Sequence, residues 1–270
     1  MESYLSNLFG LRGKTALVTG GSRGIGRALA IALASAGADI VLLVRDPSSK
    51  EVSSIASDIK ALGRGCIVYR CDLSDRSAIL SIIPQLSRDD VEIDIFVHCG
   101  GLQHRCPAED FPDTNWDEII GVNLTAGFQL SRELARHWLS TPTKGPQTFA
   151  SLGRKKIVFI ASMTTFTGAV EIPAYVASKG AIGQLTKALN NEWMNKGINV
   201  NAIAPGYIET ELTGGVKDGG EKERKILDRI PAGRWGLPAD LAGSVIHLCS
   251  KSGDYIGGEV HAIDGGYLGR

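Results

Sequence analysis

The 270-residue chain carries no excess charge of either sign, because 29 lysines and arginines balance 29 aspartates and glutamates. It therefore lacks the basic footprint of nucleic-acid-binding proteins. It also lacks any apolar run near the ~18 residues that a membrane-spanning helix needs. The first residues show no basic start followed by an apolar core, so no secretory signal is indicated. We expect a cytoplasmic protein that binds neither nucleic acid nor a membrane.

Cysteine is scarce and odd in number, and its five copies are scattered along the chain: Cys66, Cys71, Cys99, Cys106 and Cys249. Disulfide scaffolds are typically short secreted chains with an even number of cysteines. A chain of this length can bury a core without such bridges. The cysteine pattern therefore favours a reducing compartment.

What the sequence does have is a regular alternation of short apolar runs with longer helical stretches. The helical stretches include residues 49–62, 115–138 and 175–195. Seven runs are predicted as strands, at residues 14–21, 38–46, 65–75, 91–101, 155–163, 198–206 and 258–266. Continuous apolar strands separated by helices predict a parallel sheet buried on both faces.

The predicted fold class is therefore α/β, a single doubly wound Rossmann-type domain over residues 1–270. Helices flank both faces of its seven-stranded parallel sheet. Three segments fall outside this core: an N-terminal extension (1–12), an exposed loop (140–155) and a substrate lid (about 209–228). In such sheets ligands bind beyond the carboxyl ends of the strands.

A glycine-rich turn, TGGSRGIG at residues 19–26, joins the first strand to the first helix. Gly20, Gly24 and Gly26 allow the backbone to turn tightly and to approach a pyrophosphate, which then meets the helix N-terminus. A glycine turn alone is a weak signal, but its position after the first strand of an α/β sheet predicts a dinucleotide site.

The end of the second strand bears on which dinucleotide binds. A ribose 2′-hydroxyl requires an acidic residue there, whereas a 2′-phosphate requires arginine. Arg45 follows the strand and Arg23 lies inside the glycine turn, so two cations are predicted to converge on a 2′-phosphate. We therefore expect NADP(H), with NAD(H) the alternative if Asp46 instead accepts from a hydroxyl.

A candidate catalytic pair stands in YVASK, where Tyr175 and Lys179 lie one helical turn apart. A neighbouring ammonium is expected to lower the pKa of the phenol from its usual value near ~10. Ser162 ends the fifth strand and can reach the same crevice. A hydroxyl that donates to a substrate oxygen, beside a phenol that exchanges its proton, forms a carbonyl/alcohol site.

These residues, with CDLSD (71–75), GVNLT (121–125) and INVNAIAPGYIET (198–210), resemble the short-chain dehydrogenase/reductase family over nearly the whole chain. The resemblance implies that Tyr175 is the general acid/base and that Ser162 orients the carbonyl. It implies that Lys179 holds the nicotinamide ribose and that Asn123 positions a proton-relay water. It further implies cofactor contacts from Gly20, Ser22, Arg23, Gly24, Ile25, Gly26, Arg45, Asp72, Leu73, Gly100, Asn123, Tyr175, Lys179, Pro205, Gly206, Ile208 and Thr210.

Within the family, RIPAGRWGLP (229–238) and the terminal DGGYLGR are similar to 2-keto-3-deoxy-gluconate and 2-deoxy-gluconate dehydrogenases. A keto-deoxy sugar acid is the implied substrate, with substrate contacts from His104, Arg105, Ser162 and Tyr207. Glu171 departs from this pattern, because a carboxylate facing an anionic substrate would repel it. A ketoreductase acting on a neutral ketone therefore stays open.

Two further hypotheses use the same fold. A lyase or epimerase could use the tuned phenol without hydride transfer. A non-catalytic dinucleotide-binding protein would be expected to lack some of Asn123, Ser162, Tyr175 and Lys179, and all four are present. The resemblance also implies a homo-oligomer, either a dimer or a tetramer.

The segment HCGG at residues 98–101 stands where the family usually has Asn-Asn-Ala-Gly. Adjacent strand residues point to opposite sides, so His98 and Cys99 are not expected to share a metal. A metal on Cys99, His104 and Cys106 would block substrate entry, and no metal is predicted. We predict instead that His98 braces the sheet through a ring nitrogen bonded to neighbouring backbone, and that Cys99 is a small buried residue.

Overall fold

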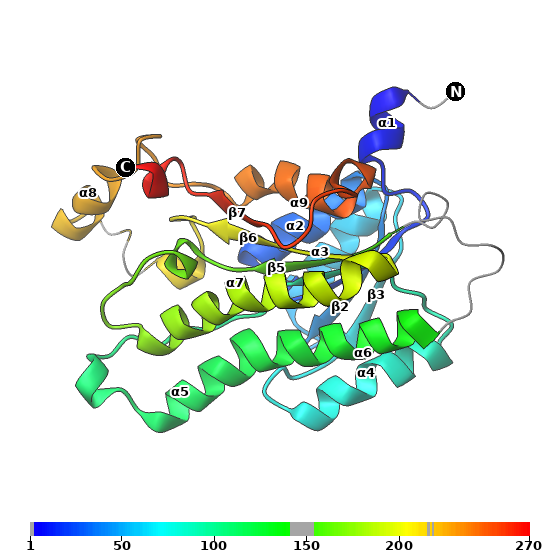
Figure 1. The fold of residues 1–270 in the computed structure, drawn as a ribbon, viewed down its shortest axis with the longest axis horizontal. Coiled ribbons are helices and arrows are strands. Elements are labelled where there is room, and N and C mark those ends of the chain that lie inside the picture. The colour runs from blue at the N-terminus through cyan, green and yellow to red at the C-terminus, as the bar shows by residue number, and fades with distance from the viewer. Residues whose placement is uncertain (1–2, 141–153, 215–216, 218) are drawn as a thin grey trace.

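The computed structural model describes residues 3–140, 154–214, 217 and 219–270. Seven parallel strands form one sheet in the order β3-β2-β1-β4-β5-β6-β7, which confirms the predicted fold class (Figure 1). The strands are β1 (Thr15–Thr19), β2 (Asp39–Val44), β3 (Cys66–Arg70), β4 (Ile95–His98), β5 (Lys155–Ile160), β6 (Ile198–Pro205) and β7 (Val260–Ile263). Of the predicted exposed loop at 140–155, residues 141–153 lie outside the described part of the chain.

Helices cover both faces of the sheet (Figure 1). One layer holds α2 (Gly24–Ser35), α3 (Lys50–Ala61) and α9 (Ala242–Cys249). The other holds α4 (Arg76–Arg88), α5 (Asp113–Ile120), α6 (Ala126–Ser140) and α7 (Pro173–Trp193). Two short helices, α1 (Tyr4–Phe9) in the N-terminal extension and α8 (Glu221–Leu227) in the predicted lid, lie outside these layers.

The central strands are apolar because both of their faces are covered. Every residue of β6 is buried, as is every residue of β4, whereas the edge strands β3 and β7 keep partly exposed positions. Sheets buried on both faces need near-continuous runs of Val, Ile, Leu and Ala. This need explains why the strands could be predicted from sequence.

The strand order reverses at β1, which pairs with β2 on one side and with β4 on the other. Chain connections leave the two neighbours in opposite directions at such a switch point, and a crevice opens beyond the carboxyl ends of the strands. Thr19 and His98, the last residues of β1 and β4, are register partners there. This edge positions the candidate site.

The predicted helix at 115–138 is present but is interrupted. Helix α5 passes through a π-helical turn, Gly121–Thr125, into α6. A π turn inserts an extra residue into the helical ladder and frequently marks a functional site. Asn123 is the central residue of this turn and is fully buried.

No helix among residues 3–140, 154–214, 217 and 219–270 is both long and apolar enough to cross a bilayer.

Candidate active site

The glycine turn after β1 approaches the turn after β4 backbone to backbone. Gly20 has a positive φ of 64°, and a Cβ built on it would lie 2.9 Å from the Gly100 nitrogen. A Cβ on Gly26 would lie 2.1 Å from the Gly20 oxygen, and one on Gly100 would lie 2.3 Å from Leu73 Cδ1. The backbone contacts require glycine at positions 20 and 26, and such a turn before a helix N-terminus is suited to a pyrophosphate.

The hydroxyl of Thr19 connects the two turns. Its Oγ1 accepts hydrogen bonds from the backbone nitrogens of Cys99 and Gly100, at 3.1 and 3.0 Å. The same oxygen lies 3.0 Å from Nδ1 of His98. The ring therefore contacts a side-chain hydroxyl that holds the neighbouring backbone, and the backbone carbonyls of Val122 and Asn123 also interact with it.

At the end of β2, the carboxylate of Asp46 is already engaged. It accepts from the backbone nitrogen and the hydroxyl of Ser48, at 2.9 and 2.6 Å, and these bonds lower its pKa. Arg45 is exposed, and its charge acts on the carboxylate of Asp72, which accepts from Ser74. Both bonds to Asp46 are made by Oδ1, and Arg45 is the exposed cation at the end of β2.

Arg23, in the glycine turn, has a partner of its own. Its guanidinium forms an ion pair of 2.7 Å with Glu211, and both side chains are mostly exposed. The same segment after β6 reaches the glycine turn, because a Cβ on Gly24 would lie 3.5 Å from the methyl group of Thr210. This ion pair could not be predicted from the sequence, since its partners are far apart along the chain.

The predicted catalytic residues meet at the carboxyl ends of β5 and β6. Ser162 follows β5 and accepts from the Thr164 nitrogen at 3.2 Å, while its hydroxyl also bonds with the Tyr175 phenol. Lys179 donates to the Ile160 carbonyl at 2.6 Å and lies 5.5 Å from the centre of the Tyr175 ring. Both Ser162 and Lys179 are buried.

The pKa of the Tyr175 phenol is raised, not lowered. Burial of the ring is the largest cause, and the hydrogen bond with Ser162 acts in the opposite direction. Burial also lowers the pKa of Lys179 to about 8. The expectation of a lowered Tyr175 pKa was therefore wrong, because burial of the phenol disfavours its charged form and is the largest cause of the shift.

Asn123 has all its polar atoms engaged. Its Oδ1 accepts from the Leu102 nitrogen at 2.9 Å, and its Nδ2 donates to the Leu102 carbonyl at 3.0 Å and to the Ser178 hydroxyl at 3.1 Å. A Cβ on Gly101 would lie 3.4 Å from Asn123 Oδ1 and 3.9 Å from Lys179 Nζ. The π turn thus holds the loop after β4 against the helix that carries Tyr175 and Lys179.

An aromatic cluster lies on the substrate side. Tyr207, just after β6, packs edge-on against Trp235 and Tyr267, with ring centres 5.2 and 5.7 Å apart. Met163, which follows Ser162, belongs to the same cluster. The cluster therefore lies beside the catalytic serine.

Two arginines act on this cluster. Arg105, after β4, and Arg229, after α8, both exert their charge on the Tyr207 hydroxyl, whose pKa is nevertheless raised, chiefly by burial. The guanidinium of Arg229 lies 4.4 Å from the centre of the Tyr267 ring. Sequence reasoning named Arg105 and missed Arg229, for which an arginine in the predicted lid was the only signal.

The remaining substrate candidates lie on two connected loops. His104 packs edge-on against Phe111, at 5.6 Å between ring centres. The backbone nitrogen of Cys106 donates to the carbonyl of Glu171 at 2.9 Å, which ties this loop to the loop before Tyr175. Glu171 itself is exposed and has a positive φ of 65°, so its carboxylate stands at a turn.

All five cysteines carry free thiols. Cys99 lies close enough to Tyr175 and Lys179 to interact with both, and burial raises its pKa to about 12. In the described part of the chain no three His, Cys, Asp or Glu side chains are grouped as metal ligands. Cys106 instead donates to the Asp110 carbonyl at 3.3 Å.

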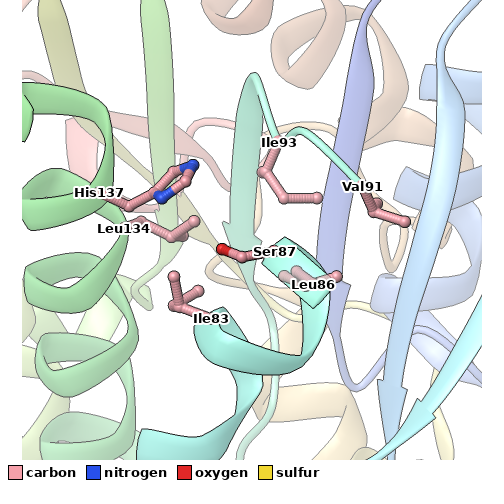
Figure 2. A pocket seen from close by; sticks show the side chains of 7 residues that line it. All are labelled: Ile83, Leu86, Ser87, Val91, Ile93, Leu134 and His137. Carbon is pink, nitrogen blue, oxygen red and sulfur yellow. The ribbon is translucent and has the colours of Figure 1, made fainter. Parts of the chain in front are cut away.

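Two cavities were found outside the catalytic group. One of about 10 Å³ lies between α4 and α6, with Val91 and Ile93 in its wall, near the amino end of β4 and away from the site (Figure 2). It holds about one water at most. The other, about 200 Å³, lies beneath Tyr207 and is lined also by Arg234, Asp240 and Asp264.

A doubly wound sheet, a glycine cradle after β1 and a buried Ser–Tyr–Lys group at the same edge define a dinucleotide-dependent dehydrogenase or reductase. Residues 20–268 match the family model described as enoyl-(acyl carrier protein) reductase, and the chain belongs to the short-chain dehydrogenase/reductase family. It is an oxidoreductase that interconverts a ketone and a secondary alcohol with a nicotinamide dinucleotide.

Among its relatives is the 2-dehydro-3-deoxy-D-gluconate 5-dehydrogenase of Pseudoalteromonas atlantica, 45% identical over 97% of this chain and 98% of that protein. The Bacillus subtilis enzyme of the same name is 42% identical over 99% of both. The crystal structure of a Burkholderia cenocepacia gluconate 5-dehydrogenase in complex with NADP and tartrate superposes with a TM-score of 0.90. It is 32% identical and covers 99% of this chain and 100% of its own.

Proposed function

We propose that this protein oxidises or reduces a keto-deoxy sugar acid with NADP(H). The observation that carries the proposal is the placement of two arginines beside an aromatic cluster that includes Met163, the residue after Ser162. The names of the two relatives support a 2-keto-3-deoxy acid that reacts at carbon 5. In such a molecule the carboxylate lies several bonds from the reacting carbon. A site for it needs cations at a distance from Tyr175.

Within the catalytic group, each residue is assigned one task. Ser162 donates to the substrate oxygen and orients the carbonyl. Tyr175 delivers its phenolic proton to that oxygen during reduction and recovers it during oxidation. Lys179 holds the nicotinamide ribose, and its cationic form favours the phenolate of Tyr175. Asn123, with its side chain fully engaged, fixes the π turn at which a proton-relay water binds.

The cofactor supplies the hydride when it is bound. The residues assigned to bind it lie at the carboxyl ends of the strands. The close approach of Gly20 to Gly100 leaves room for a pyrophosphate. Arg45 is the cation assigned to the 2′-phosphate, supported by the engagement of Asp46 with Ser48. The other assigned contacts are Ser22, Arg23, Gly24, Ile25, Gly26, Asp72, Leu73, Pro205, Gly206, Ile208 and Thr210, together with Asn123, Tyr175 and Lys179.

On the substrate side, Arg105 and Arg229 are assigned to the carboxylate, with His104 and Tyr207 as hydrogen-bonding neighbours. Guanidinium groups bind carboxylates through two parallel hydrogen bonds. Neither arginine forms an ion pair with a carboxylate among the described residues, so both guanidinium groups are available to an anionic substrate. A neutral ketone is the second candidate substrate, and the carboxylate of Glu171 on the adjoining loop favours it.

The proposal extends to the whole chain. Because all seven strands join one sheet, we assign residues 1–270 to a single domain, with the segment at 209–228 as a substrate lid. A dimer or tetramer formed through the long helices and the last strand is supported by Trp116 on α5, which is 40% exposed, and Tyr255 before β7, which is 97% exposed. Free cysteines throughout support a cytoplasmic location.

The proposal is tested by following nicotinamide absorbance with NADPH and NADH and a panel of keto sugar acids and neutral ketones. The expected result is turnover of 2-keto-3-deoxy sugar acids with NADP(H) at the higher kcat/KM. Turnover of neutral ketones alone would assign the second candidate. Substrate conversion with no change in nicotinamide absorbance would indicate a lyase or epimerase.

A further inference from the structure

A buried histidine lies between the two halves of the site, and none of the roles above uses it. His98 ends β4, is 2% exposed and belongs to neither the cofactor cradle nor the catalytic group. Buried imidazoles need hydrogen-bond partners for their ring nitrogens, and the partners determine which nitrogen carries the proton. The contacts of Thr19 allow that proton to be assigned.

The Thr19 hydroxyl has one proton to donate and two lone pairs to accept with. Both lone pairs are occupied, because the backbone N–H groups of Cys99 and Gly100 both donate to Oγ1. The hydroxyl proton is therefore left for the third neighbour, Nδ1 of His98, at 3.0 Å. Nδ1 must accept, and in the neutral ring the proton belongs on Nε2.

The Nε2 side of the ring faces the π turn that carries Asn123. Nε2 is buried and makes no hydrogen bond of good geometry with the described residues. Burial and the charge of Lys179 lower the pKa of the ring to about 3. The backbone carbonyls of Val122 and Asn123 interact with the ring and act in the opposite direction. An N–H on Nε2 therefore has two carbonyl groups of the π turn on its side of the ring.

Gly127, at the start of α6, makes room for the ring. A Cβ on Gly127 would lie 2.8 Å from His98 Cδ2 and 3.1 Å from Nε2. Glycine inside a helix is destabilising relative to alanine. Gly127 thus occupies a position where alanine would suit the helix and where the imidazole leaves no space for a methyl group.

We propose that His98, as the neutral Nε2–H tautomer, is a positioning residue that sets the cofactor turn and the Asn123 turn relative to each other. One ring nitrogen accepts from Thr19, which holds the backbone of Cys99 and Gly100. The other directs its N–H at the π turn. The inference rests on the roles proposed for Asn123 and the glycine cradle, but its first two tests need no turnover.

The first test is ¹⁵N NMR of the full-length protein with labelled histidine. One of the five histidines is expected to keep the neutral Nε2–H pattern from pH 5 to pH 8, and its signals should be absent from His98→Asn. A His98 ring that titrates near ~6.5, the usual value, or that carries its proton on Nδ1, would overturn the inference.

The second test is a double-mutant cycle between Gly127→Ala and His98→Asn, read by thermal unfolding. Gly127→Ala is expected to lower the Tm in the wild-type background, because its methyl group meets the ring. In the His98→Asn background, whose side chain is shorter, the same change should leave the Tm equal or raise it. Equal effects in both backgrounds would contradict the close contact.

The third test separates positioning from folding. Asparagine keeps a polar atom near the place of Nδ1 but has none near Nε2, so His98→Asn should bind NADPH within about twofold of wild type. Its kcat should fall by roughly tenfold with KM little changed, since a 1 Å displacement can cost up to ~100-fold. His98→Ala should weaken NADPH binding as well. If kcat were unchanged in His98→Asn, with NADPH binding intact, His98 would not position the Asn123 turn, and the proposal would be contradicted on that point.

Discussion

The cofactor edge and the substrate edge of this site are built in different ways. At the cofactor edge, backbone meets backbone, and Gly20 is fixed because a side chain on it would meet the backbone of Cys99 and Gly100. At the substrate edge, Arg105 and Arg229 are exposed side chains on loops. The first edge defines a reaction class through sterics, whereas the second defines a substrate through charge. Function at the two edges should therefore fail in different ways.

The largest effect is expected at Tyr175, which serves both edges. Tyr175→Phe removes the exchangeable proton and should lower kcat by ~10²–10⁴-fold, the usual contribution of general acid–base catalysis. NADPH affinity, measured by fluorescence titration, should stay nearly unchanged. Tyr69→Phe is the matched control. It removes a phenol hydroxyl that lies away from the site and donates to the Asp89 carboxylate at 2.6 Å. Retention of most activity in Tyr175→Phe would refute the acid/base assignment.

The next effect sharpens the substrate side of the comparison. Arg105→Ala and Arg229→Ala should each raise KM for a sugar acid by roughly 10–100-fold, because hydrogen bonds to charged groups contribute about 1.5–3 kcal/mol. KM for NADPH should not change. Arg88→Ala, at the exposed end of α4, provides the control. An equal rise in KM for a neutral ketone would mean that the arginines shape the pocket rather than bind a carboxylate.

At the cofactor edge, the cofactor preference is expected to depend on Arg45 more than on Arg23. Arg45→Ala should lower the ratio of kcat/KM for NADPH over NADH by about tenfold, since a charge-assisted bond to the 2′-phosphate is lost. Arg23→Ala should lower it less, because Glu211 already engages that guanidinium and exposed ion pairs are weak. Loss of the preference in Arg23→Ala but not in Arg45→Ala would reverse the assignment.

The smallest effect is a pH dependence of stability due to His98. Its pKa in the folded protein is about 3, below its ordinary value of 6.5, chiefly because the ring is buried. The unfolded chain therefore binds one more proton between these values, and stability falls as pH falls through this window, by about 1.4 kcal/mol per pH unit. Urea unfolding at pH 7.5 and pH 5 should show about 2 kcal/mol more loss for wild type than for His98→Asn. Parallel losses would show that His98 titrates normally.

Some features of the site could be predicted from the sequence and others could not. The glycine cradle and the buried strands could be predicted, because sterics and two-sided burial each demand particular residues. The π turn could not, since the apolar pattern of residues 115–138 continues through Gly121–Thr125 without a break. Asn123 was recognised only by family resemblance, and its bonds to Leu102 and Ser178 became visible in the structure.

Interactions between distant segments were the least predictable. The ion pair between Arg23 and Glu211 joins residues on two separate segments of the chain. Arg229 was missed because its contact with Tyr267 joins two separate segments near the C-terminus. The pKa of Tyr175 was predicted in the wrong direction because burial, which the sequence does not quantify, is the largest cause of its shift.

The central claim is that the substrate edge recognises a carboxylate while the catalytic group reduces a ketone. The most direct measurement is kcat/KM with NADPH for a 2-keto-3-deoxy sugar acid and for its primary amide, which has the same shape without the charge. The account predicts a preference for the acid of at least about tenfold, lost when Arg105 and Arg229 are both replaced by alanine. Equal values for the acid and the amide in the wild-type protein would contradict it.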